Sequence, residues 1–191
     1  MSTEHPLEDA WIRFSELDTQ GQRNDALELL DQIAADVASH PEWIRARLDE
    51  AIRLGDERLR FPLAKAMLPV LEADRAAGIV GSSTRLAWLM SHSGGRLDTA
   101  TALDDLVPEL LDRSEEEPDA MLVLRPLAVR QLTAATHEPG TSILDPAGIA
   151  LATDEDVAYL RVCCALLDTV PDPTSAELTA VAAFRASDSH R

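Results

Sequence analysis

Apolar residues recur every three or four positions along most of the chain, which is the spacing of one face of an α-helix. Between Pro6 and Thr19 the apolar residues that fall at helical spacing are Leu7, Ala10, Trp11, Phe14 and Leu17. Gly21 interrupts this series, and a second one runs from Ala26 to Val37. The pattern predicts two amphipathic helices joined by a tight turn at the glycine.

The same pattern continues toward the C-terminus. It predicts helices over residues 6–19, 24–40, 41–54, 57–77, 82–92, 98–111, 119–136, 153–167 and 177–185. Their expected caps are Asn24, Ser82 or Ser83, Asp98, Asp119 and Thr153. Pro69 and Pro108 predict kinks, Pro62 predicts a short turn before it, and residues 137–152 predict a long loop. No run alternates apolar and polar residues over the length of a strand, so we predict an all-α fold.

The turns fall at regular intervals. Gly21, Gly55 and Gly95 are 34 and 40 residues apart, and an apolar helix with small residues near its start follows each of them. Two amphipathic helices joined by a short turn cannot bury both apolar stripes by themselves, whereas a further pair stacked on top completes the burial. The spacing therefore predicts a repeated helical hairpin.

The first hairpin resembles a tetratricopeptide repeat. The residues that carry the resemblance are Trp11, Phe14, Ser15, Gly21, Ala26 and Leu30. The second unit keeps Ile44, Leu48, Ala51 and Gly55 but has Arg60 where the family has a small residue. The third keeps Trp88, Gly94, Gly95 and Ala102. The motifs are degenerate and span residues 6–113, whereas residues 119–187 show less regular helices.

The resemblance implies antiparallel helical hairpins stacked as a short right-handed α-solenoid, within one domain of 191 residues. An irregular helical bundle is the alternative, because antiparallel helices of ordinary length recur at about the same interval.

Charge narrows the range of partners. The chain has 34 acidic and 17 basic residues, which gives a formal net charge of −17. Such a field repels phosphate backbones, so we expect neither nucleic acid nor membrane as a partner. A solvated acidic surface explains this charge simply, and a surface that attracts a basic partner is the alternative.

Cys163 and Cys164 are adjacent and do not resemble a disulfide framework, and no signal peptide or membrane-length apolar run is evident. We expect a cytoplasmic protein.

No residue set resembles a catalytic site, and we expect no cofactor. No two histidines are three or four residues apart, so a zinc or di-iron helix site has no support. Asp105 and Glu109 lie one helical turn apart, a placement that can hold Mg²⁺, although a solvated helix face explains them more simply. We interpret His92 as a residue that interacts with the last carbonyls of its helix.

These observations favour a non-catalytic scaffold that binds other proteins. In a stack of hairpins the first helices line a concave surface, which accepts an extended peptide or a helix. Position and polarity give the groove candidates Arg13, Glu16, Arg45, Asp49 and Arg85. We expect removal of these charges to cost less than about 0.5 kcal/mol of stability. Two alternatives are a small all-α enzyme or ligand binder with a carboxylate site near Asp105 and Glu109, and a protein that associates with itself.

Overall fold

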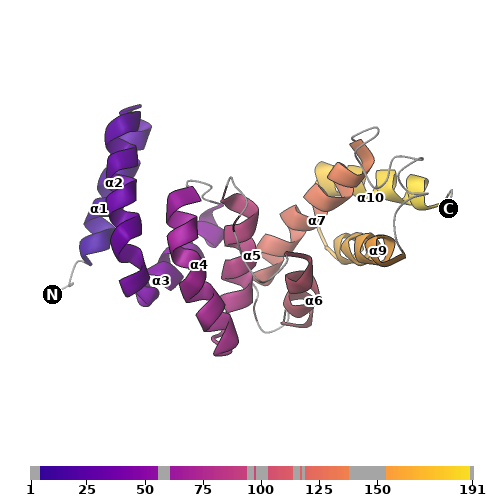
Figure 1. Cartoon of the computed structure of the whole chain (residues 1–191). Helices are drawn as coiled ribbons and strands as arrows, with labels where there is room; N and C mark the ends of the chain where they lie inside the picture. Colours follow the sequence, from indigo (N-terminus) through magenta and orange to yellow (C-terminus); the bar gives the residue numbers. More distant parts are fainter. Residues whose placement is uncertain are drawn as a thin grey trace. The chain divides into compact units, whose positions relative to one another are not determined.

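The computed structural model describes residues 5–55, 61–93, 97, 103–113, 117, 119–137 and 154–189. Every regular element in these ranges is helical, which confirms the all-α prediction (Figure 1). The elements are α1 (Pro6–Thr19), α2 (Arg23–Asp36), the short 3-10 helix η1 (Val37–Ser39), α3 (Pro41–Leu54), α4 (Phe61–Ala76), α5 (Ser82–His92), α6 (Leu103–Arg113), α7 (Ala120–His137), α9 (Asp154–Asp168) and α10 (Ser175–Asp188).

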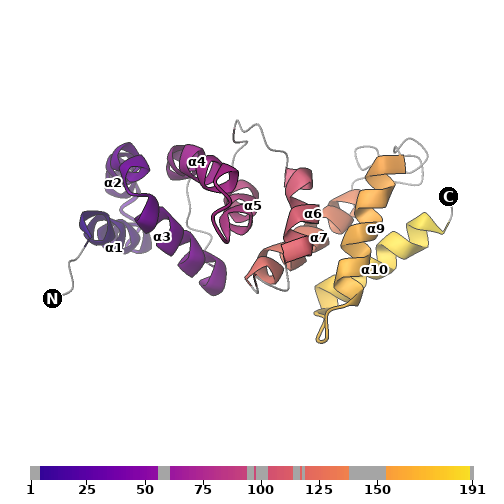
Figure 2. The same ribbon diagram turned by 90° about the horizontal axis from the view of Figure 1, so that it is seen from below.

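The chain divides into two compact units, Met1–Ala120 and Met121–Arg191. The boundary falls where the repeat-like pattern of the sequence ends. In the first unit α2 packs on α1 and α4, and α5 packs on α3, α4 and α6. Figure 2 shows α4 and α5 side by side. The second unit contains α9 packed on α10, together with most of α7.

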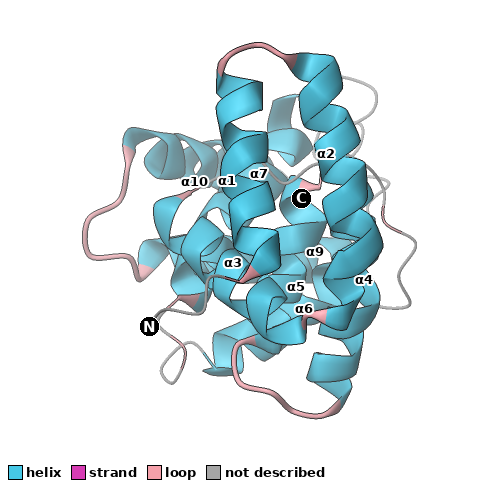
Figure 3. Cartoon of the chain, turned by 90° about the vertical axis from the view of Figure 1, so that its left-hand side faces the viewer, coloured by secondary structure: helices cyan, strands magenta, loops and turns pink. Residues whose placement is uncertain are grey.

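Glycine residues follow the ends of α1 and α3, as the sequence predicts. Gly21 and Gly55 have φ values of +73° and +64°, in the left-handed region that glycine adopts without steric cost. The Gly55 N–H donates to the carbonyls of Ala51 and Ile52 at the end of α3. Figure 3 shows α1 and α2 alongside one another, joined by a short turn. Gly95 lies outside the described residues.

Three predictions of how helices begin are wrong by one or two residues, namely the cap of α2, the cap of α5 and the first residue of α10. Asn24 does not cap α2, because the Ala26 N–H already donates to the Gln22 carbonyl, and the helix begins at Arg23. Neither Ser82 nor Ser83 caps α5, since the cap position is Gly81 with a φ of +77°. The predicted caps at Asp98 and Thr153 lie outside the described residues.

The third wrong start is that of α10, where a reciprocal cap extends the helix toward the N-terminus. The Glu177 N–H donates to Thr174 Oγ1 at 3.3 Å, and the Thr174 N–H donates to Glu177 Oε2 at 2.6 Å. This capping box makes Glu177 the third residue of the helix instead of the first.

Proline residues occupy exposed sides of helices. Pro69, Pro108 and Pro126 lie inside α4, α6 and α7, respectively, and all three are exposed. A proline has no N–H to donate, so the carbonyl four residues earlier lacks its usual helical partner. On an exposed side water can bind that carbonyl, which allows the helix to continue past the proline.

An ion pair joins α7 to α10 in the second unit. Arg125 Nε and Nη2 donate to the two carboxylate oxygens of Glu177 at 2.7 and 2.9 Å, and the Glu177 side chain is buried. The hydrogen bond from Arg125, with help from Thr174, outweighs the cost of burial and lowers the pKa of Glu177 to about 2. Glu177 therefore fixes both the start of α10 and its contact with α7.

We predict that Glu177→Gln destabilises the second unit by about 2 kcal/mol at neutral pH, because a charge-assisted hydrogen bond is lost. A depressed folded-state pKa stabilises the protein above the unfolded value of 4.5, and this stabilisation is lost as the pH falls toward 2. The difference between wild type and variant should therefore shrink from pH 6 to pH 3. Urea unfolding followed by the NMR signals of Val181 and Phe184 measures it. A constant difference across this range would contradict the assignment.

Candidate functional site

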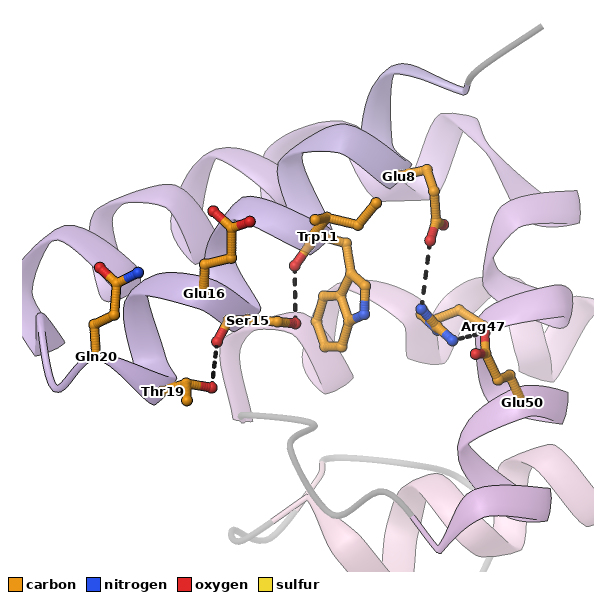
Figure 4. Close-up of a pocket in the computed structure, with 9 residues that line it drawn as sticks. Glu8, Trp11, Ser15, Glu16, Thr19, Gln20, Arg47 and Glu50 are labelled. Carbon is orange, nitrogen blue, oxygen red and sulfur yellow. Dashed lines mark hydrogen bonds and ion pairs between the residues drawn. The ribbon is translucent and has the colours of Figure 1, made fainter. Parts of the chain in front are cut away.

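An open pocket of about 500 Å³ lies between α1 and α3 (Figure 4). Seven of its residues come from α1 and its end, and two come from α3. They are Glu8, Trp11, Ile12, Ser15, Glu16, Thr19, Gln20, Arg47 and Glu50. We call this the α1–α3 pocket. It joins the first helices of the first two predicted hairpins.

The buried side chains of Trp11 and Arg47 form the floor of the α1–α3 pocket, and Trp43 packs behind Trp11. Trp11 packs edge to face on Trp43, with ring centroids 6.2 Å apart, and both side chains are buried. The Arg47 guanidinium carbon lies 5.5 Å from the centre of the Trp11 ring, in cation–π contact. Arg47 is only 9% exposed, so its charge belongs to the floor.

Carboxylates surround this arginine. Glu8 Oε1 lies 3.6 Å from Arg47 Nη1, and Glu8 Oε2 accepts a hydrogen bond of 2.9 Å from Trp43 Nε1. Glu50 pairs with Arg47 from the next turn of α3. Figure 4 shows the Arg47 side chain between Glu8 and Glu50. These contacts tie the start of α1 to the middle of α3.

A smaller pocket of about 200 Å³ lies where α3, the start of α5 and residues shortly before α7 meet. Its lining residues are Asp49, Val80, Gly81, Thr84, Arg85, Glu117 and Asp119. We call it the α3–α5 pocket. Arg85 donates to both Asp49 carboxylate oxygens at 2.7 and 2.9 Å, and the Thr84 hydroxyl donates to Glu117 at 3.0 Å. An arginine on the later helix again meets a carboxylate on the earlier one.

The five groove candidates from the sequence fall into different places. Glu16 lines the α1–α3 pocket, and its Oε2 accepts from Arg13 at 3.1 Å on the exposed surface of α1. Asp49 and Arg85 line the α3–α5 pocket. Arg13 and Arg45 line neither of these pockets, and Arg45 pairs with Asp74 of α4 at 2.8 and 2.7 Å.

These ion pairs revise the expectation that charges at the candidate positions can be removed at little cost. Asp74 is buried, and the hydrogen bond from Arg45 outweighs that burial, so the pKa of Asp74 lies below its ordinary value. Removing Arg45 would leave a buried carboxylate without this partner. The same reasoning applies to Asp49 and Arg85, whose side chains are partly buried.

The carboxylate of Glu109 is bound by neighbours within the first unit. It accepts hydrogen bonds from Ser83 Oγ at 2.5 Å and from Arg75 Nε at 3.1 Å, and Arg113 lies 3.3 Å away. Burial disfavours the charge, but these donors outweigh it, and the pKa of Glu109 is lowered. The side chain of Asp105 lies outside the described residues. Among the residues that are described, no group of three or more His, Cys, Asp or Glu side chains could hold a metal ion.

His92 behaves as the sequence suggests. Its Nδ1 lies 3.0 Å from the Trp88 carbonyl oxygen in the last turn of α5, and its ring stacks on the Trp88 indole at 4.5 Å. The interpretation of His92 as a residue that contacts the final carbonyls of its helix is confirmed.

A third pocket, of about 760 Å³, lies along α7 and the start of α10 in the second unit. Its lining includes Met121, Leu122 and Val129, so it is mainly apolar. Arg125 at its edge already pairs with Glu177. None of the five groove candidates lines this pocket.

Sequence reasoning missed Glu8, Arg47 and Glu50 as residues of one site. The signal that could have found part of it is the repeat interval, because Glu8 and Trp43 are 35 positions apart. The burial of Arg47 has no such signal, since arginine at this position of an amphipathic helix is usually exposed.

Comparison of the chain with protein-family models, with curated proteins and with solved structures finds no match. Within the described residues, none of the helices has both the length and the apolar character needed to cross a membrane.

We predict that Asp49→Ala and Arg85→Ala each destabilise the first unit by about 1–2 kcal/mol, because each change breaks a bidentate, partly buried pair. The double variant should cost less than the sum of the two single variants, by about 1 kcal/mol. Thermal or urea unfolding of the four proteins gives this coupling energy. Additive effects would show that the pair contributes little, as is typical of fully exposed pairs.

Proposed function

We propose that the chain is a non-catalytic scaffold for protein–protein interaction and that a peptide or helix from its partner docks in the α1–α3 pocket. The observation that carries this proposal is an open pocket between helices of two consecutive hairpins, with the buried Trp11 and Arg47 at its floor. Buried tryptophan and arginine that support an exposed rim are common at the centre of protein interfaces.

Polar contacts at the repeat interval support the stacking of the hairpins. Among the described residues of the first unit, side-chain hydrogen bonds join four pairs of residues that are 33 to 36 positions apart. They are Glu8–Trp43, Arg75–Glu109, Thr84–Glu117 and Asp49–Arg85. In a helical-repeat protein each unit contacts its neighbours, so bonds of this separation join equivalent parts of successive units. This supports a tetratricopeptide-like α-solenoid.

The hydroxyl groups in the α1–α3 pocket support a binding role over a catalytic one. Ser15 Oγ donates to the Trp11 carbonyl at 2.9 Å, and Thr19 Oγ1 donates to the Ser15 carbonyl at 2.7 Å. A nucleophilic hydroxyl needs a base that accepts its proton, whereas these two donate to backbone oxygens of their own helix. The second candidate function, a carboxylate site near Asp105 and Glu109, rests on a Glu109 carboxylate that already binds Ser83 and Arg75.

We predict that Ile12→Asp abolishes partner binding while leaving the fold intact. Ile12 is 50% exposed at the rim of the pocket, so its replacement should cost little stability but should place a charge where a partner packs. Leu27→Asp is the matched control, because Leu27 on α2 is 43% exposed and lies outside the pocket lining. Quantitative pull-down with mass spectrometry should show at least a tenfold loss for Ile12→Asp only.

Two results of this pull-down would oppose the scaffold proposal. One is retention of every partner by Ile12→Asp. The other is an equal loss of the same partners with Leu27→Asp, which would show that any exposed charge on these helices has that effect. Circular dichroism melts of both variants establish that they are folded.

A further inference from the structure

The charges of the α1–α3 pocket are separated by depth. Its one basic side chain, Arg47, is 9% exposed, whereas the side chains of Glu8, Glu16 and Glu50 are 43%, 52% and 53% exposed. The positive charge therefore lies in the floor and the negative charges lie at the rim. A partner approaching from solvent meets carboxylates first.

Two rim carboxylates are about half exposed, so solvent or a partner can reach them. Glu16 uses Oε2 to accept from Arg13, and Glu50 uses Oε2 to pair with Arg47. About half of each side chain is exposed, 52% for Glu16 and 53% for Glu50. Glu8 differs, because Trp43 and Arg47 contact its two oxygens. Glu16 and Glu50 are thus the more exposed acceptors for a cationic donor.

An apolar side chain lies in the same lining as these acceptors. Ile12 is half exposed and precedes Glu16 by one helical turn on α1, so the two side chains lie on the same face of the helix. Arginine and lysine combine an apolar stem with a charged head, and both parts can bind at once where apolar and acidic groups adjoin.

The α3–α5 pocket shares the excess of carboxylates but not their placement at the rim, because Glu117 is as buried as Arg85. Arg85 is 11% exposed and is bound to Asp49, while Glu117 and Asp119 complete the lining with two further carboxylates. Each of the two pockets therefore contains one arginine against three acidic residues. Carboxylates therefore line two pockets of this unit at fixed positions.

We infer that the partner presents a basic amphipathic peptide segment whose arginine or lysine, next to an apolar residue, occupies the α1–α3 pocket. The cationic head binds Glu16 and Glu50, and the apolar neighbour packs on Ile12. Charge-assisted hydrogen bonds to carboxylates are stronger than neutral ones, and the net charge of −17 speeds the approach of a basic partner. This inference rests on the proposed scaffold function and names the chemistry of its partner.

The test uses the full chain and three labelled 14-residue helical peptides as probes. The first has arginine and leucine at helical spacing, the second has glutamate in place of each arginine, and the third has serine in place of each leucine. Fluorescence anisotropy gives the Kd values, and the amide NMR signals of Ile12, Ser15 and Thr19 locate the binding. We expect the arginine–leucine peptide to bind most tightly and to shift these signals.

Charge-matched variants separate the pocket from the overall charge. Glu16→Gln combined with Glu50→Gln should raise the Kd of the arginine–leucine peptide at least fivefold, and Glu16→Gln alone should raise it at least twofold. Glu28→Gln combined with Asp31→Asn is the control, because it removes the same two negative charges from exposed positions on α2. This control should change the Kd less than twofold. Glu16→Gln breaks only an exposed pair with Arg13, so it keeps the fold.

Three outcomes would overturn the inference. Equal weakening by the control pair would show that net charge alone attracts the peptide. If the glutamate–leucine peptide binds with equal affinity and shifts the same NMR signals, the pocket binds peptides without a preference for cations. The basic segment is then wrong, whereas the scaffold function stands. If no probe shifts these signals but Ile12→Asp still loses its cellular partners, the inferred basic segment is wrong. The scaffold function then stands. The scaffold function itself is opposed by the two pull-down results given above, which are retention of the partners by Ile12→Asp and their equal loss with Leu27→Asp.

Discussion

The first unit depends on ion pairs that fix α3 to three other helices. Arg47 contacts Glu8 of α1, Arg45 binds Asp74 of α4, and Asp49 binds Arg85 of α5. Two of these pairs are bidentate, and a bidentate guanidinium–carboxylate pair restricts the orientation of both side chains. Apolar burial drives the helices together without specifying one register, whereas paired charges at fixed positions do specify it. Both pockets of this unit are built on α3, so their shapes follow from the same pairs.

The same pairs explain why the accessible charge of the pockets is acidic. Acidic residues outnumber basic ones by 34 to 17, and several arginines are used as internal contacts. Arg47 and Arg85 lie beneath the surface of their pockets, and Arg125 binds the buried Glu177 in the second unit. Arginine suits this role because its planar guanidinium is less strongly hydrated than an ammonium group and can bind two oxygens at once. Carboxylates in excess of these arginines remain for the solvent and for partners.

Local signals in the sequence were sufficient to predict the helices but not the contacts between them. The period of the apolar residues and the left-handed glycines Gly21 and Gly55 depend on neighbours a few positions away, and they located the first hairpin turn and the end of α3. The start of α10 was misplaced although Thr174 and Glu177, three positions apart, carry the sequence signature of a capping box, which places Glu177 in the first turn. The partners of Arg45 and Asp49 lie 29 and 36 positions away. The sequence contains many other acidic residues that could have paired with Arg45 and many other basic residues that could have paired with Asp49. Exposure was assumed for both residues because charged helix positions usually face solvent, and the ion pairs reverse that preference.

The division between a fixed floor and an exposed rim bears on how the α1–α3 pocket can bind. Trp43 and Arg47 each contact Glu8, and the Trp11 ring holds the guanidinium of Arg47, so the floor is ordered before any partner arrives. An ordered floor loses little side-chain entropy on binding, and that loss is one of the main costs of association. The rim residues Ile12, Glu16 and Glu50 remain exposed and can adjust to the partner. Stability and recognition are therefore assigned to different side chains, and the rim can change without disturbing the helix contacts beneath it.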